Sequence, residues 1–394
     1  MSRLSHRLQN MSYSQTLAMT AKARELRAQG HNVISLSVGE PDFVPPRFVL
    51  DAAKKAIDEG HHYYTPVPGY LELREVVCKK FQRDNGLHYQ PSQIVVSTGG
   101  KQSIINVLLS LLDPGDELII PAPYWVSYYE MVKLCEAIPI VISTGIETDF
   151  KITPEQLEKA ITPKTRGFLF SSPCNPSGSV YSRDELKVLA DVFQKYPEVI
   201  IISDEIYEHI HYAGSHTSMA VFPEVYEQTV TLNGLSKAFA MTGWRIGYIG
   251  APEWLAKACD KVQGQTTSGA NAVAQCAAIA ALKASPERIG YMIEAFKKRR
   301  DLILALLDDI PGFLSNVPQG AFYVFPNVSN LFGKSFSGSF IRNADDLAMF
   351  LLEKAHVGTV SGAAFGDEQS LRISYAVSEE RLREAFQWIS EALR

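Results

Sequence analysis

One lysine stands in surroundings that favour covalent chemistry. Lys237 follows an apolar run at 229–232 and lies in a stretch of mainly small and apolar residues, 234–248. Because an apolar environment disfavours the ammonium form, such a lysine is a good amine nucleophile. Arg245, further along the same stretch, adds a second cation that suits a bound dianion.

A glycine-rich turn offers an anion site. Gly99, Gly100 and Lys101 follow a strand-like run at 93–97 and precede a helical pattern. Backbone N–H groups and the helix dipole at such a position bind anions, commonly phosphate. The turn does not match GxxxxGK[ST], and by itself a glycine turn also suits an ordinary strand-to-helix connection.

Two further strand-like runs end in polar residues. Asn175 lies in a rigid turn after one of them, and Asp204 and Tyr207 follow the next. Ligands of open α/β sheets bind at the carboxyl ends of strands, so we expect these groups to share one site with Lys237. An amine, a carboxylate and a phosphate cradle together are what pyridoxal phosphate requires.

The elements that must position these groups alternate between strand and helix. Several short runs are nearly all apolar, as in strands covered on both faces. The alternation predicts a doubly wound α/β domain over about residues 46–283. The strand-like runs are 93–97, 117–121, 139–142, 167–170, 199–203, 229–232 and 248–250, and helical patterns include 103–112 and 183–194.

The pattern changes after residue 285, which predicts a smaller α+β domain over 284–394. Residues 1–45 hold one helix and the loop 37–43, and we expect them to join this domain at a cleft. The elements expected after residue 285 are a charged helix at 286–309, a short strand at 321–325, a helix near 345–354 and a closing helix from 379.

Composition excludes several classes of protein. With 38 Lys and Arg against 43 Asp and Glu, the net charge is −5, so a nucleic-acid-coating surface is not expected. Five cysteines without a CxxC pair indicate neither a disulfide framework nor a zinc site. We find no signal-peptide core and no apolar run of about 18 residues, and we therefore expect a cytoplasmic protein without a membrane segment.

Two other features suggest sites that we do not expect. His209 and His211 offer two ligands without a supporting cluster, so we expect no metal. The run Lys-Lys-Arg-Arg at 297–300 lies in a helix of mixed charge, so we expect a solvated face or a dimer contact.

The sequence resembles the class I and II aminotransferases of fold type I, most closely the aspartate aminotransferase subgroup common in bacteria. The resemblance covers nearly the whole chain, with the motifs in the family's order and approximate spacing. It implies a large mixed-sheet domain that binds pyridoxal phosphate and a small domain, 1–45 and 284–394, that closes over it. The motifs are Ser37-Val38-Gly39-Glu40-Pro41, Tyr63-Tyr64-Thr65, Asn175-Pro176-Ser177-Gly178, Asp204-Glu205-Ile206-Tyr207, Ser236-Lys237 and Leu371-Arg372-Ile373-Ser374-Tyr375.

The resemblance implies a role for each cofactor residue. Lys237 corresponds to the lysine that binds the cofactor covalently and then carries protons, and Asp204 to the carboxylate that keeps the ring nitrogen protonated. Asn175 and Tyr207 correspond to donors to the ring's phenolic oxygen, and Trp125 to the ring stacked on the cofactor. The phosphate site comprises Gly99, Gly100, the backbone of Lys101, Ser236 and Arg245, with Tyr64 supplied by the other subunit of a homodimer.

The resemblance also implies the substrates, which are amino acids and 2-oxo acids. Gly39 and Arg372 correspond to the site of the α-carboxylate, beside Trp125 and Asn175, and Lys101 and Thr16 to that of the distal carboxylate. We expect transfer of the amino group from aspartate or glutamate to 2-oxoglutarate or oxaloacetate by a ping-pong mechanism. Prephenate, aromatic or kynurenine transamination, β-lyase activity and a non-catalytic binding role remain alternatives.

Overall fold

The computed structural model describes residues 4–13 and 15–394, and its main feature is a seven-stranded sheet. The strand order is β2-β8-β7-β6-β5-β3-β4. The strands pair in parallel except β8, which is antiparallel to both its neighbours. Their bounds are β2 Ile94–Thr98, β3 Glu117–Pro121, β4 Ile138–Ile142, β5 Thr165–Ser171, β6 Ile200–Asp204, β7 Thr229–Gly234 and β8 Ile246–Gly250.

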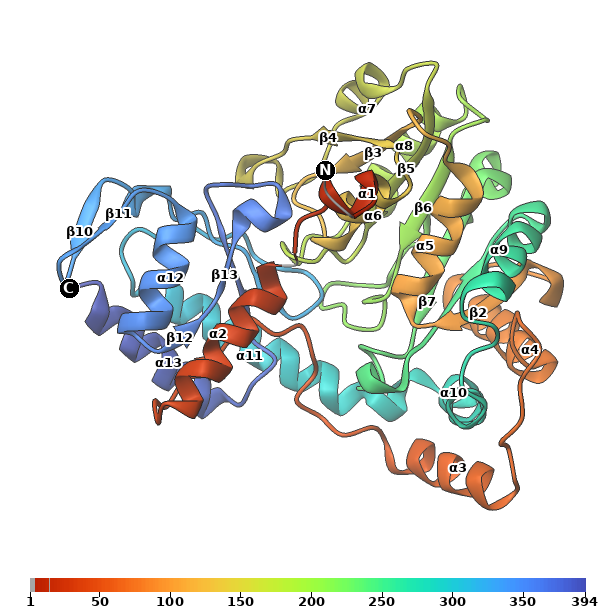
Figure 1. Cartoon of the computed structure of the whole chain (residues 1–394), viewed down its shortest axis with the longest axis horizontal. Coiled ribbons are helices and arrows are strands. Elements are labelled where there is room, and N and C mark those ends of the chain that lie inside the picture. Colours follow the sequence, from red (N-terminus) through yellow and green to blue (C-terminus); the bar gives the residue numbers. More distant parts are fainter. Residues whose placement is uncertain (1–3, 14) are drawn as a thin grey trace.

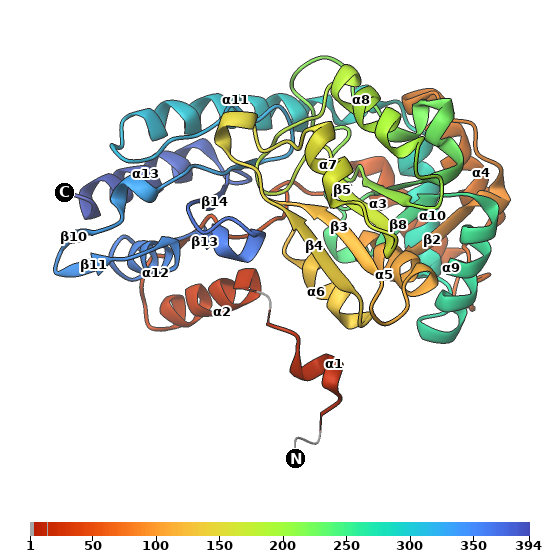
Figure 2. The ribbon, with the colours of Figure 1, turned by 90° about the horizontal axis from the view of Figure 1, so that it is seen from above.

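Helices cover both faces of this sheet (Figures 1 and 2). Alternate side chains of β5 serve the two layers, since Leu169 packs in one apolar cluster and Phe168 and Phe170 in another. A strand buried on both faces has no polar side, which is why it is apolar throughout. One face carries α5 (Gly100–Leu111), α6 (Ser127–Leu134) and α9 (Glu253–Thr266), and the other carries α4 (Leu71–Lys80), α8 (Arg183–Phe193) and α10 (Ala272–Lys283), with α3 (Arg47–Asp58) against α10 and α7 (Pro154–Ala160) beside α8.

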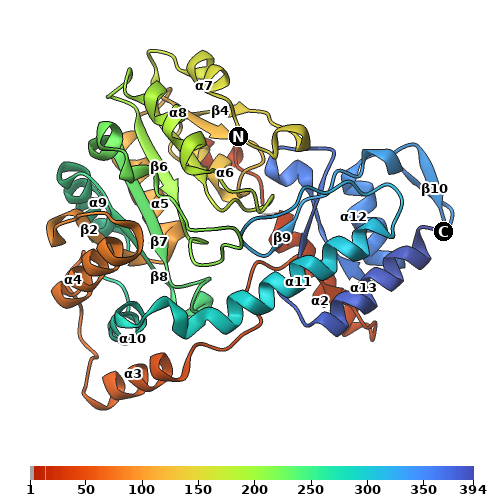
Figure 3. The same ribbon diagram turned by 180° about the vertical axis from the view of Figure 1, so that it is seen from behind.

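The last hundred residues pack with the N-terminal segment. β1 (Ile34–Ser35) pairs in parallel with β12 (Val357–Gly358), and α2 (Gln15–Ala28) lies beside them. The long helix α11 (Gly290–Asp308) runs from the end of α10 toward α13, as Figure 3 shows. The other elements are β9 (Tyr323–Val324), β13 (Val360–Ser361) and β14 (Leu371–Ser374) in one antiparallel sheet, the hairpin β10 (Lys334–Phe336) and β11 (Ser339–Ile341), and the helices α12 (Ala344–Lys354) and α13 (Glu379–Ala392).

The seven predicted strands are confirmed, each within two residues of its expected bounds. Three expectations are wrong. The first 45 residues contain a second short helix, α1 (His6–Gln9), and residues 286–289 form a 3-10 turn before α11 begins. The run 297–300 is not wholly solvated, because Arg299 is only 9% exposed. In the part of the chain that is described, no helix is long and apolar enough to cross a membrane.

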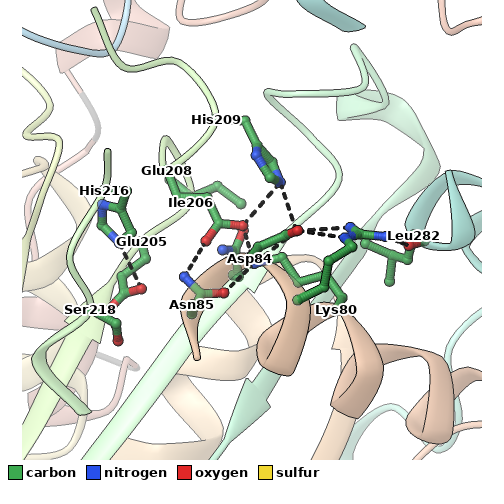
Figure 4. Close-up of polar contacts among 12 residues, drawn as sticks. Lys80, Asp84, Asn85, Glu205, Ile206, Glu208, His209, His216, Ser218 and Leu282 are labelled. Atoms are coloured by element: carbon green, nitrogen blue, oxygen red, sulfur yellow. Dashed lines mark hydrogen bonds and ion pairs between the residues drawn. The ribbon is translucent and has the colours of Figure 1, made fainter. Parts of the chain in front are cut away.

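A buried network of charges joins α4 to the loop after β6 (Figure 4). Lys80 contacts the carboxylate of Glu208, and the two side chains are 1% and 3% exposed. Asn85 bridges the pair, since it accepts from Lys80 Nζ at 2.8 Å and donates to Glu208 Oε2 at 2.8 Å. His209 Nε2 lies 3.1 Å from the same carboxylate, so this network holds the loop that carries Tyr207.

The network also brings together groups that ligate metals. Oxygens of Asp84 and Glu208 and a ring nitrogen of His209 lie within 4.8 Å of one another. Each carboxylate already has a cation, since Lys80 contacts Glu208 and Arg83 donates to both oxygens of Asp84, at 2.5 Å and 2.9 Å.

Lys80→Met should lower the free energy of unfolding by about 3–5 kcal/mol, because it leaves a carboxylate buried without its cation. Burial would raise the pKa of Glu208, but Lys80 holds it at about 2, below the ordinary 4.5. The stabilisation is therefore complete above about pH 4.5 and declines as the pH falls toward 2. Denaturant unfolding of wild type and variant at pH 7 and at decreasing pH measures both effects.

The exposed neighbour provides the control, since Lys79→Met removes a cation of the same helix that the network does not use. It should change the free energy of unfolding by no more than about 0.5 kcal/mol. A loss below about 1 kcal/mol for Lys80→Met at pH 7 would contradict our account of the pair.

Candidate functional site

A cavity of about 490 Å³ opens at the carboxyl ends of β2, β5, β6 and β7. It brings together twelve of the residues that the sequence indicated, whereas Gly99 lies just behind its wall and Tyr64 is fully exposed at 100%. The twelve residues are Thr16, Gly39, Gly100, Lys101, Trp125, Asn175, Asp204, Tyr207, Ser236, Lys237, Arg245 and Arg372.

Lys237 and Asp204 form the reactive centre of the cavity. Lys237 Nζ donates to the carbonyl oxygen of Gly39 at 2.6 Å. Burial, with Arg372 nearby, lowers the pKa of Lys237 to about 8. Burial raises the pKa of Asp204 to about 6, although hydrogen bonds from Tyr128 and the backbone of Ile206 oppose the shift. The cavity therefore presents an amine that is readily neutral and a carboxylate that keeps its charge at neutral pH.

A glycine cradle forms one end of the cavity. A Cβ atom on Gly99 would lie 2.2 Å from Arg245 Nη2, and one on Gly247 would lie 2.3 Å from the backbone nitrogen of Gly100. Since α5 begins at Gly100, its first N–H groups are free to meet an anion. Burial, with a contribution from Arg245, lowers the pKa of Lys101. Bare backbone and the guanidinium of Arg245 make this end suitable for a phosphate.

Arg372 also lines the cavity and is only 2% exposed. Its Nη1 donates to Asn175 Oδ1 at 3.0 Å and its Nη2 to the carbonyl oxygen of Ser37 at 2.6 Å. The guanidinium lies over the rings of Tyr323 and Phe365, 4.7 and 4.8 Å from their centroids. Its buried Nε has no hydrogen-bond partner among the residues described. A fixed guanidinium with an unused donor is suited to a carboxylate.

Two tyrosines of the site were missed by sequence reasoning. Tyr128 Oη donates to Asp204 Oδ2 at 2.6 Å, and the hydroxyls of Tyr207 and Tyr323 are 2.8 Å apart. Tyr128 lies on α6, 76 positions before Asp204, and no spacing connects the two. Tyr323 falls in the predicted strand at 321–325. Because successive side chains of a strand point to opposite faces, Tyr323 was expected on the face opposite to Phe322 and Val324, and this was the available sequence signal.

Glu205, the neighbour of Asp204 in sequence, is not among the residues that line the cavity. Figure 4 shows it beside His216 and Ser218. The carboxylate of Glu205 accepts hydrogen bonds from Ser203 Oγ at 2.9 Å and Ser218 Oγ at 2.7 Å and pairs with His216 Nε2 at 2.9 Å. Burial would lower the pKa of His216, but the charge of Glu205 raises it overall. These contacts satisfy Glu205 and fix the turn so that Asp204 faces the cavity.

Comparison with known proteins places this geometry in a family. The model described as aminotransferase class I and II matches residues 31–389. The chain is 48% identical over 385 residues to an aspartate/prephenate aminotransferase of Cereibacter sphaeroides, covering 97% of this chain and 96% of that protein. It is 45% identical over 389 residues to an aspartate aminotransferase of Geobacillus stearothermophilus, covering 98% of each.

Solved structures show the same similarity. The crystal structure of the aspartate aminotransferase from Rhizobium meliloti superposes with a TM-score of 0.96 at 42% identity, covering 100% of this chain and 99% of that one. The aspartate aminotransferase from Thermus thermophilus with maleate superposes with a TM-score of 0.94 at 41% identity, covering 100% of both chains.

Proposed function

The chain belongs to the class I and II aminotransferases, and we propose that it moves the amino group of aspartate or glutamate to a 2-oxo acid with pyridoxal phosphate as cofactor. The observation that carries the proposal is that the Lys237 amine, the glycine cradle and the Arg372 guanidinium line one cavity. Amino acids and 2-oxo acids both carry the carboxylate that a guanidinium fork binds.

The residues present fit pyridoxal phosphate. Arg245 occupies the space that a Cβ atom on Gly99 would need. The glycine cradle therefore consists of bare backbone and a guanidinium group. Gly100, Ser236 and Arg245 would hold the phosphate, Asp204 would face the ring nitrogen, and Asn175 and Tyr207 would face the phenolic oxygen. When bound, the cofactor supplies an electron sink for charge that develops at the substrate's Cα.

The chain's own residues supply binding and proton transfer. Arg372 binds the α-carboxylate, while Asn175 Oδ1 holds the guanidinium in position. Lys237 holds or releases a proton at Nζ, and its pKa of about 8 lets both forms exist near neutral pH. Tyr128 donates to Asp204 and thereby keeps this carboxylate oriented and charged. Trp125 lines the cavity and would present its ring to the cofactor.

Two polar side chains of the cavity, Lys101 and Thr16, support a second carboxylate. Lys101 Nζ lies 4.8 Å above the ring of Trp125, and the buried Oγ1 of Thr16 has no hydrogen-bond partner among the described residues. We assign Lys101 and Thr16 to the side-chain carboxylate of aspartate or glutamate. Prephenate also has a second carboxylate, and the relative from Cereibacter sphaeroides is named for it, so prephenate is the second acceptor to test.

We propose a homodimer in which Tyr64 reaches the phosphate of the partner. Tyr64 is 100% exposed and Tyr63 86% exposed, so both rings are available to a second chain. The small domain, 1–45 and 284–394, would close over the cavity, and the pairing of β1 with β12 supports this division. Five free cysteines support a reducing compartment such as the cytoplasm.

Lys237→Ala should lower kcat by more than about a thousand-fold, because the amine is both the covalent anchor and the base. In the wild type, burial lowers the pKa of this amine to about 8, so covalent attachment of pyridoxal phosphate should accelerate as the pH rises through 8. Borohydride trapping followed by mass spectrometry of the intact protein measures the rate. The exposed Lys261→Ala is the control, and a rate independent of pH between 7 and 9 would contradict the assignment.

Lys101→Ser should lower kcat/KM for aspartate by roughly ten- to a hundred-fold, since it removes a partly buried charged hydrogen bond worth about 1.5–3 kcal/mol. Activity toward alanine, which has no second carboxylate, should change much less. Steady-state kinetics with both donors tests the assignment. An equal loss for the two donors would show that Lys101 serves the cofactor or the fold instead.

Tyr64→Phe should weaken the retention of cofactor, and mixed dimers test whether the hydroxyl acts across the interface. A dimer of one Tyr64→Phe chain and one Lys237→Ala chain has one site with both residues intact. Random mixing should thus restore roughly a quarter of the wild-type sites. Activity that stays at the level of the unmixed variants would mean that Tyr64 acts within its own subunit.

A further inference from the structure

The basic run at 297–300 contains an arginine that faces into the protein. Arg299 Nη1 lies 2.7 Å from Asp42 Oδ1, and Arg299 Nη2 lies 2.9 Å from Asp42 Oδ2. Two parallel charged hydrogen bonds fix both the position and the plane of the carboxylate, which a single contact cannot do. The pair joins the middle of α11 to the loop 37–43, which borders the cavity.

Aromatic rings keep the pair partly out of water. The Arg299 guanidinium lies 5.2 Å from the ring centroid of Phe43 and 5.6 Å from that of Phe296. The two rings meet edge to face, with centroids 5.4 Å apart. Only 10% of the Arg299 side chain and 30% of the Asp42 side chain are exposed, so solvent screens this pair less than a surface pair.

Asp42 stands three positions after Gly39, with Pro41 between them, so a shift of one is transmitted to the other. The pyrrolidine ring of Pro41 fixes one backbone angle of this short span. Gly39 lies tightly against Tyr323, because a Cβ atom at this position would be 2.5 Å from Tyr323 Oη. The carbonyl of Gly39 accepts from Lys237 at 2.6 Å.

Two side chains donate hydrogen bonds to backbone carbonyls of the loop, and both belong to groups that act in the cavity. Lys237 holds the carbonyl of Gly39, and Arg372 holds that of Ser37. Lys237 must leave Gly39 when it binds or accepts a proton elsewhere, and Arg372 must turn part of its fork to a ligand. The Arg299–Asp42 pair lies outside the cavity lining, so it persists when the cavity is occupied.

We propose that Arg299 and Asp42 are positioning residues that hold Gly39 against Tyr323 while Lys237 and Arg372 engage their ligands, and that they thereby set the affinity for the substrate's α-carboxylate. The proposal rests on the proposed function, since it assigns Gly39 and Arg372 to that carboxylate. Neither Arg299 nor Asp42 lines the cavity, so their removal should affect binding more than the chemical step.

The holoenzyme of the variant Arg299→Gln provides the test. KM for aspartate should rise roughly tenfold while kcat stays within about twofold of wild type. The dissociation constant for maleate, an unreactive dicarboxylate, should rise by the same factor with cofactor content unchanged. Arg299→Lys should recover only part of the affinity, because an ammonium group cannot form the fork.

Asp42→Asn should reproduce the effect, and the double variant Asp42→Asn/Arg299→Gln should be no weaker than either single variant, because both changes remove one interaction. Lys298→Gln is the matched control, since it removes the adjacent exposed cation of α11 and should leave both constants unchanged. Thermal unfolding shows the temperature below which all variants are folded, and binding and kinetics are measured there.

Three outcomes would overturn the proposal. First, Arg299→Gln could show wild-type values of KM for aspartate and of the maleate dissociation constant. The pair would then have a structural role alone, even if the variant had a lower unfolding temperature. A joint loss of kcat and cofactor content would assign it to the cofactor or the fold. An additive double variant would show that the two residues act separately. An inactive wild type would refute the proposed function instead, and maleate binding would then decide the role of the pair by itself.

Discussion

Charges held away from water at the carboxyl edge of the large sheet are the constraint on which the rest of the molecule depends. Arg372 is 2% exposed and Asp204 5% exposed, and an uncompensated buried charge costs several kcal/mol. Compensation comes from distant segments, since Ser37 and Asn175 meet the guanidinium and Tyr128 meets the carboxylate. The loops therefore have to converge where the strands end, and the cavity lies at this convergence.

Most of the large sheet could be predicted, because strands that are buried on both faces consist of short, nearly continuous runs of apolar residues. The sequence predicted fewer elements of the part formed by the N-terminal segment and the last hundred residues. Its strands β1, β12 and β13 are two residues long each, too short for any periodicity to develop. Their existence follows from pairing between segments such as 34–35 and 357–358, which no local pattern contains.

The same division holds for the cavity. Residues that directly follow strands, such as Asp204 and Lys237, could be identified from the sequence, whereas Tyr128 on α6 could not, because its contact with Asp204 is made only by packing. Arg299 was misjudged for another reason. Charge alone suggested a solvated face, but the residue follows Phe296 by three positions and precedes Ile303 by four, which puts it on the buried side of α11.

The hydrogen bond from Arg372 to the carbonyl of Ser37 joins residues 335 positions apart, and this separation bears on how the chain is made. Synthesis runs from the N-terminus, so β2 to β8 can pair before the C-terminal partners of β1 and of the loop 37–43 exist. β1 can pair only after β12 has been synthesised. The loop at 37–43 can form its contacts with α11 and Arg372 only after those residues have been synthesised. On the ribosome the lysine and its carboxylate are thus in place early, while the cavity is completed only when the last strands emerge, and a chain stopped after β8 would carry the sheet without a binding site.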